Sequence, residues 1–189
     1  MMHGLVNRAI EGFVRITYGD ALWNVAASAA GVDSRGIVLM RQDETGLTDR
    51  LMKELSCRLD RSPRDLAEDV GAWVARLPSI RRLLRFAGSD FAAFMMALPE
   101  LDGRARMVVR GFELPRLTVT RQAGGWRIAS DCEPIWLHAI VGMLHAMADD
   151  YGVLAVIALE GRTINVVVPL ADFSAGRPFS FSDPTVGAA

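Results

Sequence analysis

The spacing of hydrophobic residues predicts helices through the first half of the chain. Between residues 4 and 17, apolar side chains recur at three- and four-residue intervals, which is the spacing of one helix face. The same criterion predicts further helices over 21–30, 47–59, 63–77, 80–86 and 91–98, with a polar loop over 32–45. Asp20, Ser62 before Pro63, and Ser89 or Asp90 are suitable N-caps. The helix over 91–98 is apolar on all sides, so we expect it to be buried.

The pattern changes in the second half. Short apolar stretches at 117–120 and 126–130 flank Gly124-Gly125, and those at 153–159 and 163–168 flank residues 160–162. Each arrangement predicts a β-hairpin. A helix is predicted between them, over 135–149. Helices followed by two hairpins around a helix indicate an α+β fold with a four-stranded antiparallel sheet.

Composition narrows the classes of function. A chain of 189 residues suits a single domain, and a net charge of -1 gives no field that favours nucleic acid or an anionic membrane. No apolar run reaches the roughly 18 residues that a membrane span needs, and Cys57 and Cys132 form no paired motif. We therefore expect a cytoplasmic protein with free thiols, without nucleic-acid or membrane partners.

The sequence carries no recognisable catalytic or metal-binding motif. His138 and His145 are seven residues apart on one predicted helix, and with Gly142 and Asp149 they form a stripe that we interpret as a polar outer face. A zinc site would require histidines four apart or additional ligands. No nucleophile elbow, phosphate-binding loop or HExxH sequence is present. We therefore expect neither enzymatic activity nor a metal site.

Three stretches resemble the heme–nitric oxide/oxygen binding family, also called H-NOX or HNOB. The first is the opening run from Met2, with Val6-Asn7 and Tyr18-Gly19 at positions where the family repeats those residue types. The second is Gly88-Ser89-Asp90, and the third is Gly111 with Pro115, the turn and proline after the family's ligand helix. The resemblance extends from Met2 to about Pro169 and implies the H-NOX fold.

The resemblance also identifies the position of the family's iron ligand. Family members carry a Leu-Asp-x-Leu-His pattern whose histidine is the sole protein ligand of heme iron. Counting without a gap from Gly88 to Pro115 places that histidine at Asp102, whereas an alternative register places it at Ala105. Neither register supplies a histidine.

A second family signature, Tyr-x-Ser-x-Arg, holds the two heme propionates. Counting back from Val141-Gly142 places Ala129, Asp131 and Glu133 at these positions, and a shift by one residue gives Ser130, Cys132 and Pro134 instead. Both registers lack the tyrosine and the arginine. The first also reverses the charge, so its carboxylates would repel the propionates.

The family's heme is surrounded by large apolar side chains, and this chain has its own set at the corresponding positions. We expect them to fill the former heme space as a packed core, because a large empty cavity costs about 24 cal/mol per Å³. An apolar pocket for another ligand, such as a fatty acid, is the alternative. The candidate lining residues are His3, Leu5, Trp73, Phe91, Phe94, Met95, Phe112 and Trp136.

We predict a single H-NOX-like domain over residues 1–170, helical to about 112, followed by a loose tail over 171–189. The resemblance implies a sensory or regulatory domain that acts through a signalling partner such as a histidine kinase or a cyclic-nucleotide enzyme. With both heme contacts missing, we expect no ordinary heme cofactor. One alternative is a heme-based nitric oxide or oxygen sensor with a substitute ligand such as His3, and another is a carrier of an apolar ligand.

Overall fold

The computed structural model describes residues 3–32, 46–108 and 115–169. Four helices form the first half: α1 (His3–Tyr18), α2 (Asp20–Ala29), α3 (Leu47–Leu59) and α4 (Pro63–Arg76). Ser62 caps α4 by accepting a hydrogen bond from the backbone of Asp65 at 3.1 Å, as its sequence predicts. The predicted loop over 32–45 and the predicted tail lie outside the described residues, apart from Val32.

The next elements connect the helical half to the sheet. They are α5 (Pro78–Arg85), α6 (Phe91–Ala97), the 3₁₀ helix η1 (Leu98–Glu100) and α7 (Leu101–Val108). Asp90 is the cap of α6, because its Oδ1 accepts a hydrogen bond from the backbone of Ala93 at 2.8 Å. The apolar pattern ends at Leu98, so it gave no sign of α7.

The two predicted hairpins join in one sheet. Their strands are β1 (Leu117–Gln122) with β2 (Gly125–Ser130), and β3 (Val156–Glu160) with β4 (Thr163–Val167). All neighbours are antiparallel, in the order β1-β2-β4-β3, and α8 (Pro134–Tyr151) lies between the hairpins in the chain. The expected α+β fold is confirmed, although β3 begins three residues later than predicted.

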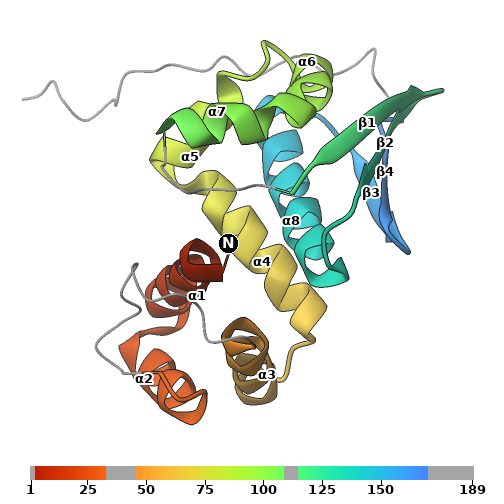
Figure 1. Cartoon of the computed structure of the whole chain (residues 1–189). Helices are drawn as coiled ribbons and strands as arrows, with labels where there is room; N and C mark the ends of the chain where they lie inside the picture. The colour runs from red at the N-terminus through yellow and green to blue at the C-terminus, as the bar shows by residue number, and fades with distance from the viewer. Residues whose placement is uncertain (1–2, 33–45, 109–114, 170–189) are drawn as a thin grey trace, which may run out of the picture.

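The described residues form two hydrophobic cores. Figure 1 shows the elements that surround them. The helical core lies among α1, α2, α3 and the first half of α4, and the sheet core lies among α5 to α8 and the inner face of the sheet. Helix α4 belongs to both, because Leu66, Ala67 and Val70 face the helical core and Ala75 faces the sheet core.

Helices α4 and α8 cross in backbone contact. A Cβ added to Gly71 would lie 1.9 Å from the carbonyl oxygen of Ala139, and one added to Gly142 would lie 1.8 Å from that of Glu68. The two glycines therefore let the helices approach more closely than any side chain allows. The reciprocal arrangement fixes where the two helices meet along their lengths.

The predicted polar outer face of α8 is wrong at His138 and Gly142, which lie against α4. His138 Nδ1 lies 2.7 Å from Oε1 of Glu68, and Asp149 forms a 3.4 Å ion pair with Arg76. Both partners belong to α4, as does the carbonyl next to Gly142. The prediction holds for His145 and Asp149, which are exposed. The middle of the stripe faces α4 because Gly142 has no side chain that would keep the two helices apart.

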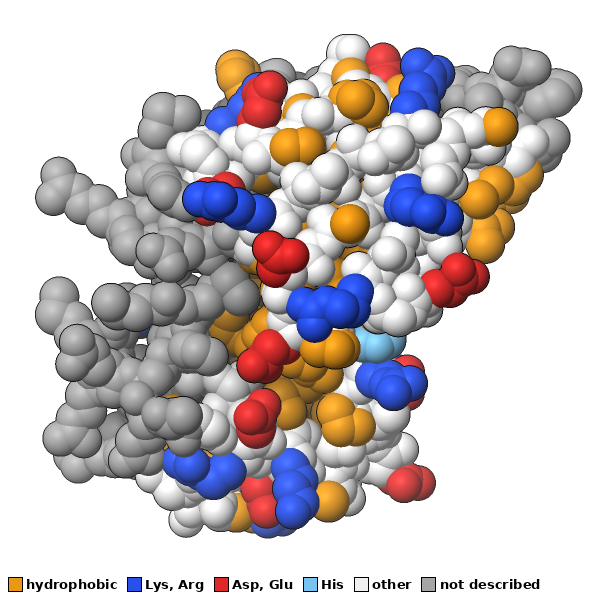
Figure 2. Space-filling model, turned by 45° about the vertical axis from the view of Figure 1, so that its right-hand side comes forward, with side chains coloured by type: hydrophobic (Ala, Val, Ile, Leu, Met, Phe, Trp, Pro, Cys, Tyr) orange, Lys and Arg blue, Asp and Glu red, His pale blue; other side chains and the backbone are white. Residues whose placement is uncertain are grey.

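The sheet has one covered and one open face among the described residues. Helix α8 lies against one face of the sheet (Figure 1). The side chains of that inner face are buried or partly buried, and those of the outer face are mostly exposed. On the surface shown in Figure 2, acidic and basic groups are interspersed rather than separated. None of the described helices is long and apolar enough to span a membrane.

Candidate functional site

The predicted iron-ligand position lies just after a break between two helices. Pro99 lies within the 3₁₀ turn that separates α6 from α7, and proline cannot donate the backbone hydrogen bond that a continuous helix needs. Leu98 and Leu101 are buried on either side of the break, and Asp102 follows as a half-buried residue in the first turn of α7. A carboxylate is favourable there, because it faces the positive end of the helix dipole.

The predicted propionate-binding positions lie at the end of β2 and in the β2–α8 loop. Ala129, Asp131 and Glu133 are all exposed, and Glu133 is the N-cap residue of α8 without using its side chain as a cap. Pro115, the third family anchor, is half-buried just before β1. The β2–α8 loop therefore presents two carboxylates to solvent.

An arginine holds this loop from another part of the sheet. Arg162, in the β3–β4 turn, donates hydrogen bonds to the carbonyl oxygens of Asp131 and Cys132 at 2.5 and 2.9 Å. Sequence reasoning missed this residue because it lies about thirty positions away and matches no family motif. Its guanidinium is committed to backbone oxygens, where it fixes the course of the loop.

The donor chemistry at these positions does not fit a heme. In the register that the resemblance implies, Asp102 would offer a carboxylate in place of the family's imidazole, and in the alternative register Ala105 would offer no ligand atom. Asp131 and Glu133 would repel the propionates that the family's arginine attracts. In these registers, the residues at the two expected contact positions do not have the chemistry by which the family holds its cofactor.

The predicted lining residues that the structure describes are distributed over the surroundings of two cores. Phe91, Phe94 and Met95 are at most 3% exposed and belong to the sheet core. Trp73 belongs to the surroundings of the helical core, where its ring lies 6.2 Å from that of Phe13. Trp136 is half-buried. The side chains of His3 and Leu5, and all of Phe112, lie outside the described residues.

The buried aromatic residues of the sheet half pack against one another. Phe91 contacts Phe94, Trp126 and Tyr151 with ring-centroid distances of 5.9 to 6.1 Å, and Phe94 lies 5.7 Å from Tyr151. Aromatic pairs at these separations are favourable beyond their buried area. These side chains are packed as a core.

Tyr151 anchors this aromatic group to α5 and to the turn before α6. Its hydroxyl donates a hydrogen bond to the carbonyl oxygen of Gly88 at 2.8 Å, and the guanidinium of Arg85 lies 4.0 Å from its ring centroid. Burial raises the pKa of the Tyr151 hydroxyl above its ordinary value of 10, and the positive charge of Arg85 opposes that shift. The neutral hydroxyl is thus the stable form.

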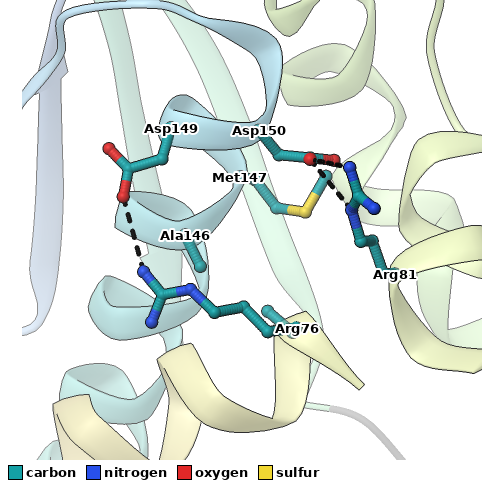
Figure 3. A pocket seen from close by; sticks show the side chains of 7 residues that line it. Arg76, Arg81, Ala146, Met147, Asp149 and Asp150 are labelled. Atoms are coloured by element: carbon teal, nitrogen blue, oxygen red, sulfur yellow. Dashed lines mark hydrogen bonds and ion pairs between the residues drawn. The ribbon is translucent and has the colours of Figure 1, made fainter. Parts of the chain in front are cut away.

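A small cleft lies between α4, α5 and α8 (Figure 3). Its volume is about 320 Å³, and buried Ala75, Ala146 and Met147 contribute its apolar lining. Two ion pairs border it, Arg76 with Asp149 and Arg81 with Asp150, so each guanidinium already faces a carboxylate. We infer that these arginines neutralise the two carboxylates and the negative dipole end at the C-terminal turn of α8, rather than bind a ligand.

No metal centre is found among the residues that the structure describes. They contain no group of three or more histidine, cysteine, aspartate or glutamate side chains that could hold an ion. The closest approximation is the pair of His138 and Glu68, which offers only two ligands. A structural zinc site uses four.

Comparison with known proteins identifies the family. The chain matches the profile of the family described as "Haem-NO-binding" (HNOB) over residues 3–152, whereas no curated protein matches it. An H-NOX protein from S. oneidensis in the Fe(II) ligation state has a TM-score of 0.76 and 13% identity, with 88% of this chain and 96% of that chain covered.

Two further solved structures have the same fold. A Cs H-NOX mutant has a TM-score of 0.72 at 14% identity, covering 89% of this chain and 97% of that chain. A mutant of T. Tengcongensis H-NOX has a TM-score of 0.70 at 14% identity, covering 89% and 98%. At such low identity these likenesses establish the fold alone. Because the family profile matches most of this chain, the chain belongs to the haem-NO-binding (HNOB) family.

Proposed function

We propose that this chain is an H-NOX regulatory domain that has lost ordinary heme binding and acts through a signalling partner. The observation that carries the proposal is the exposed pair of carboxylates, Asp131 and Glu133, where the family resemblance expects a hydroxyl and a guanidinium. Loss of the imidazole at Asp102 is an independent change in the same direction. Either change alone weakens a cofactor site, and together they remove both known points of attachment.

The packing of the sheet half also supports this proposal. Phe91, Phe94 and Met95 are buried against other side chains, so their apolar surface needs no porphyrin to cover it. Arg162 orders the β2–α8 loop through backbone carbonyls, so this loop is held by the chain itself.

A regulatory role without enzymatic activity is consistent with the described residues. The family match concerns a sensor domain, and the clusters described above contain no nucleophile paired with a base. We propose that the domain, spanning about residues 1–170 with a tail at 171–189, operates in the cytoplasm on a histidine kinase or a cyclic-nucleotide enzyme.

A heme-loading experiment tests the loss of the cofactor. The chain is expressed with added heme precursor, in parallel with the S. oneidensis H-NOX as a positive control, and purified protein is scanned for heme absorption. We expect a loaded control and no stoichiometric Soret band for this chain. A stoichiometric band that shifts with nitric oxide would overturn the proposal, and its loss in His3→Ala would identify the substitute ligand.

Two further measurements test how the domain acts. Pull-down with kinases and cyclic-nucleotide enzymes encoded nearby should retain one of them, and failure with every neighbour contradicts the partner proposal. Native mass spectrometry of the purified chain should show the mass of the polypeptide alone. A co-purified apolar molecule would instead support the ligand-carrier alternative.

A further inference from the structure

The two edges of the sheet differ in how they are protected. At one edge, β1 packs beside η1 and carries the polar residues Thr118, Thr120, Arg121 and Gln122. At the other edge, β3 reads Val-Ile-Ala-Leu before Glu160, with no lysine, arginine or proline. Proteins usually protect edge strands with charges, proline or a covering element, because an open edge pairs with other strands. Among the described residues, β3 has none of these devices before Glu160.

The hairpin register defines which backbone groups of β3 point outward. A two-residue turn, Gly161-Arg162, joins Glu160 to Thr163, and such a turn places these flanking residues in a hydrogen-bonded pair. Hydrogen-bonded pairs then alternate along the ladder, so Ala158 and Val156 also bond to β4. The backbone N–H and C=O groups of Ile157 and Leu159 therefore point away from β4, to an edge at which no other described strand pairs.

Apolar side chains surround this free edge. Leu154, Val156 and Val167 are 68%, 56% and 45% exposed, and the two valines are register partners on the outer face. Ile157 and Leu159, on the inner face, are only partly buried. Figure 2 shows exposed hydrophobic side chains on the sheet side of the molecule, at the right of that view.

We propose that β3 is the seam of a homodimer, in which a second copy of this chain adds its own β3 antiparallel to the first. In this arrangement Ile157 lies opposite Leu159 of the second copy, and the two-fold axis passes beside Ala158. The register uses the outward backbone groups on both copies and produces one eight-stranded sheet. The inference is independent of the proposed regulatory function.

A second copy fits this edge better than an unrelated strand. The arrangement is isologous, so the outward donors of each Ile157 and Leu159 meet the matching acceptors of the same residues in the other copy. Ala158 is small enough for two copies to meet at the axis. Glu160 lies opposite Val156 of the second copy, so like charges do not face each other across the seam. Glu160 is also held within its own sheet by Asn165 at 2.9 Å.

The short seam predicts a weak dimer. Five residues and the neighbouring apolar side chains bury less than the roughly 800 Å² per partner of a standard interface. We therefore expect association that depends on protein concentration, measurable by sedimentation equilibrium of the full chain. A molecular mass that remains monomeric at millimolar concentration would overturn the proposal.

Cross-linking tests the register. In a background that carries Cys57→Ser and Cys132→Ser, Ala158→Cys places two thiols opposite each other at a non-hydrogen-bonded pair, where Cα atoms are about 4.5 Å apart. We expect mild oxidation to give a disulfide-linked dimer. Ala129→Cys in the same background is the matched control, because Ala129 is an exposed alanine on the same face with strands on both sides. Equal dimer yields from the two variants would contradict the seam.

Blocking the edge tests the seam without cross-linking. Ala158→Lys places two positive charges at the axis and leaves the inner face unchanged, so we expect monomers at every concentration with an unchanged far-ultraviolet circular dichroism spectrum. Ile157→Pro removes an outward N–H that β4 does not use, and should have the same effect. Persistence of the dimer in folded Ala158→Lys would place the interface elsewhere. A monomeric wild type whose partner capture is lost in Ala158→Lys would assign the edge to another protein and overturn the proposal.

Discussion

The helical half and the sheet half of this domain are stabilised by different kinds of core. Aliphatic side chains and alanines dominate the helical core, which also encloses one hydrogen bond, from Thr48 Oγ1 to Asn7 Oδ1 at 2.7 Å. The sheet core contains a group of four aromatic rings and depends on Tyr151 and Arg85 at its margin. All four rings of the sheet core are buried, whereas the described ring group of the helical half, Phe13 with Tyr18 and Trp73, has only Phe13 buried.

The largest effect is expected from removing an aromatic ring of the sheet core. Phe94→Ala deletes a side chain that is 0% exposed, and should lower the free energy of unfolding by about 4 kcal/mol. Leu51→Ala is the matched change in the helical core, also 0% exposed, with an expected loss of about 3 kcal/mol. Urea unfolding followed by circular dichroism measures both. Because α4 belongs to both cores, each variant should show a single transition, and two separate transitions would break the comparison.

The second prediction concerns the contact between the two halves. Gly142→Ala would place a Cβ 1.8 Å from a backbone oxygen of α4, so the helices must separate, at a cost of about 3 kcal/mol. Gly103→Ala is the control, because no atom lies within 4 Å of its added Cβ and alanine favours a helix by roughly 0.5–1 kcal/mol. Thermal unfolding should rank the two variants on opposite sides of the wild type. Equal stability of both would show that the α4–α8 crossing tolerates a methyl group.

The third prediction tests the polar contact of the helical core. Thr48→Val preserves the side-chain shape but removes the hydroxyl that donates to Asn7 Oδ1. Asn7 is 1% exposed, and its amide nitrogen makes no hydrogen bond within the described part of the chain. Leaving a buried carbonyl oxygen unpaired should cost about 2 kcal/mol. Urea unfolding measures this loss, and the double variant Asn7→Leu with Thr48→Val should recover part of it. Failure of the double variant to recover any stability would show that the pair matters through packing.

The smallest effect is expected at the margin of the sheet core. Tyr151→Phe removes the hydrogen bond to Gly88 and should cost about 1 kcal/mol at neutral pH. Because the folded-state pKa of Tyr151 is raised, the unfolded chain loses its phenolic proton first, and wild-type stability should fall as pH rises above about 10. The variant should lose less stability over that range. Parallel pH profiles of the two proteins would contradict this assignment.

Local signals were sufficient to predict most elements of this fold. Ser62 before Pro63, Asp90 before the apolar helix and the Gly-containing turns are short-range features, and each marks a boundary in the structure. Helix α7 was missed because it has only eight residues, and a glycine and two arginines interrupt its apolar pattern. Local chemistry thus predicts where elements begin better than which faces meet.

The candidate site was less predictable, because its important contacts are distant in sequence. Nothing near Arg162 indicates that it holds the β2–α8 loop, and nothing near His138 indicates that Glu68 of α4 is its partner. The predicted lining set mixed residues of two cores, since similarity of residue type does not distinguish Trp73 from Phe91. Asp102 and the two loop carboxylates were placed by resemblance, and their lost function stays a prediction.

Helix α4 has a consequence for how this protein can be divided. Its first half completes one core and its last turn contributes to the other, so a chain cut within residues 63–76 would leave each fragment with an uncovered apolar stripe. Neither fragment should be soluble by itself, and mixing them should restore both. A chimaera of two related chains joined within this helix should therefore not fold. A chimaera joined at the loop before or after the helix should fold.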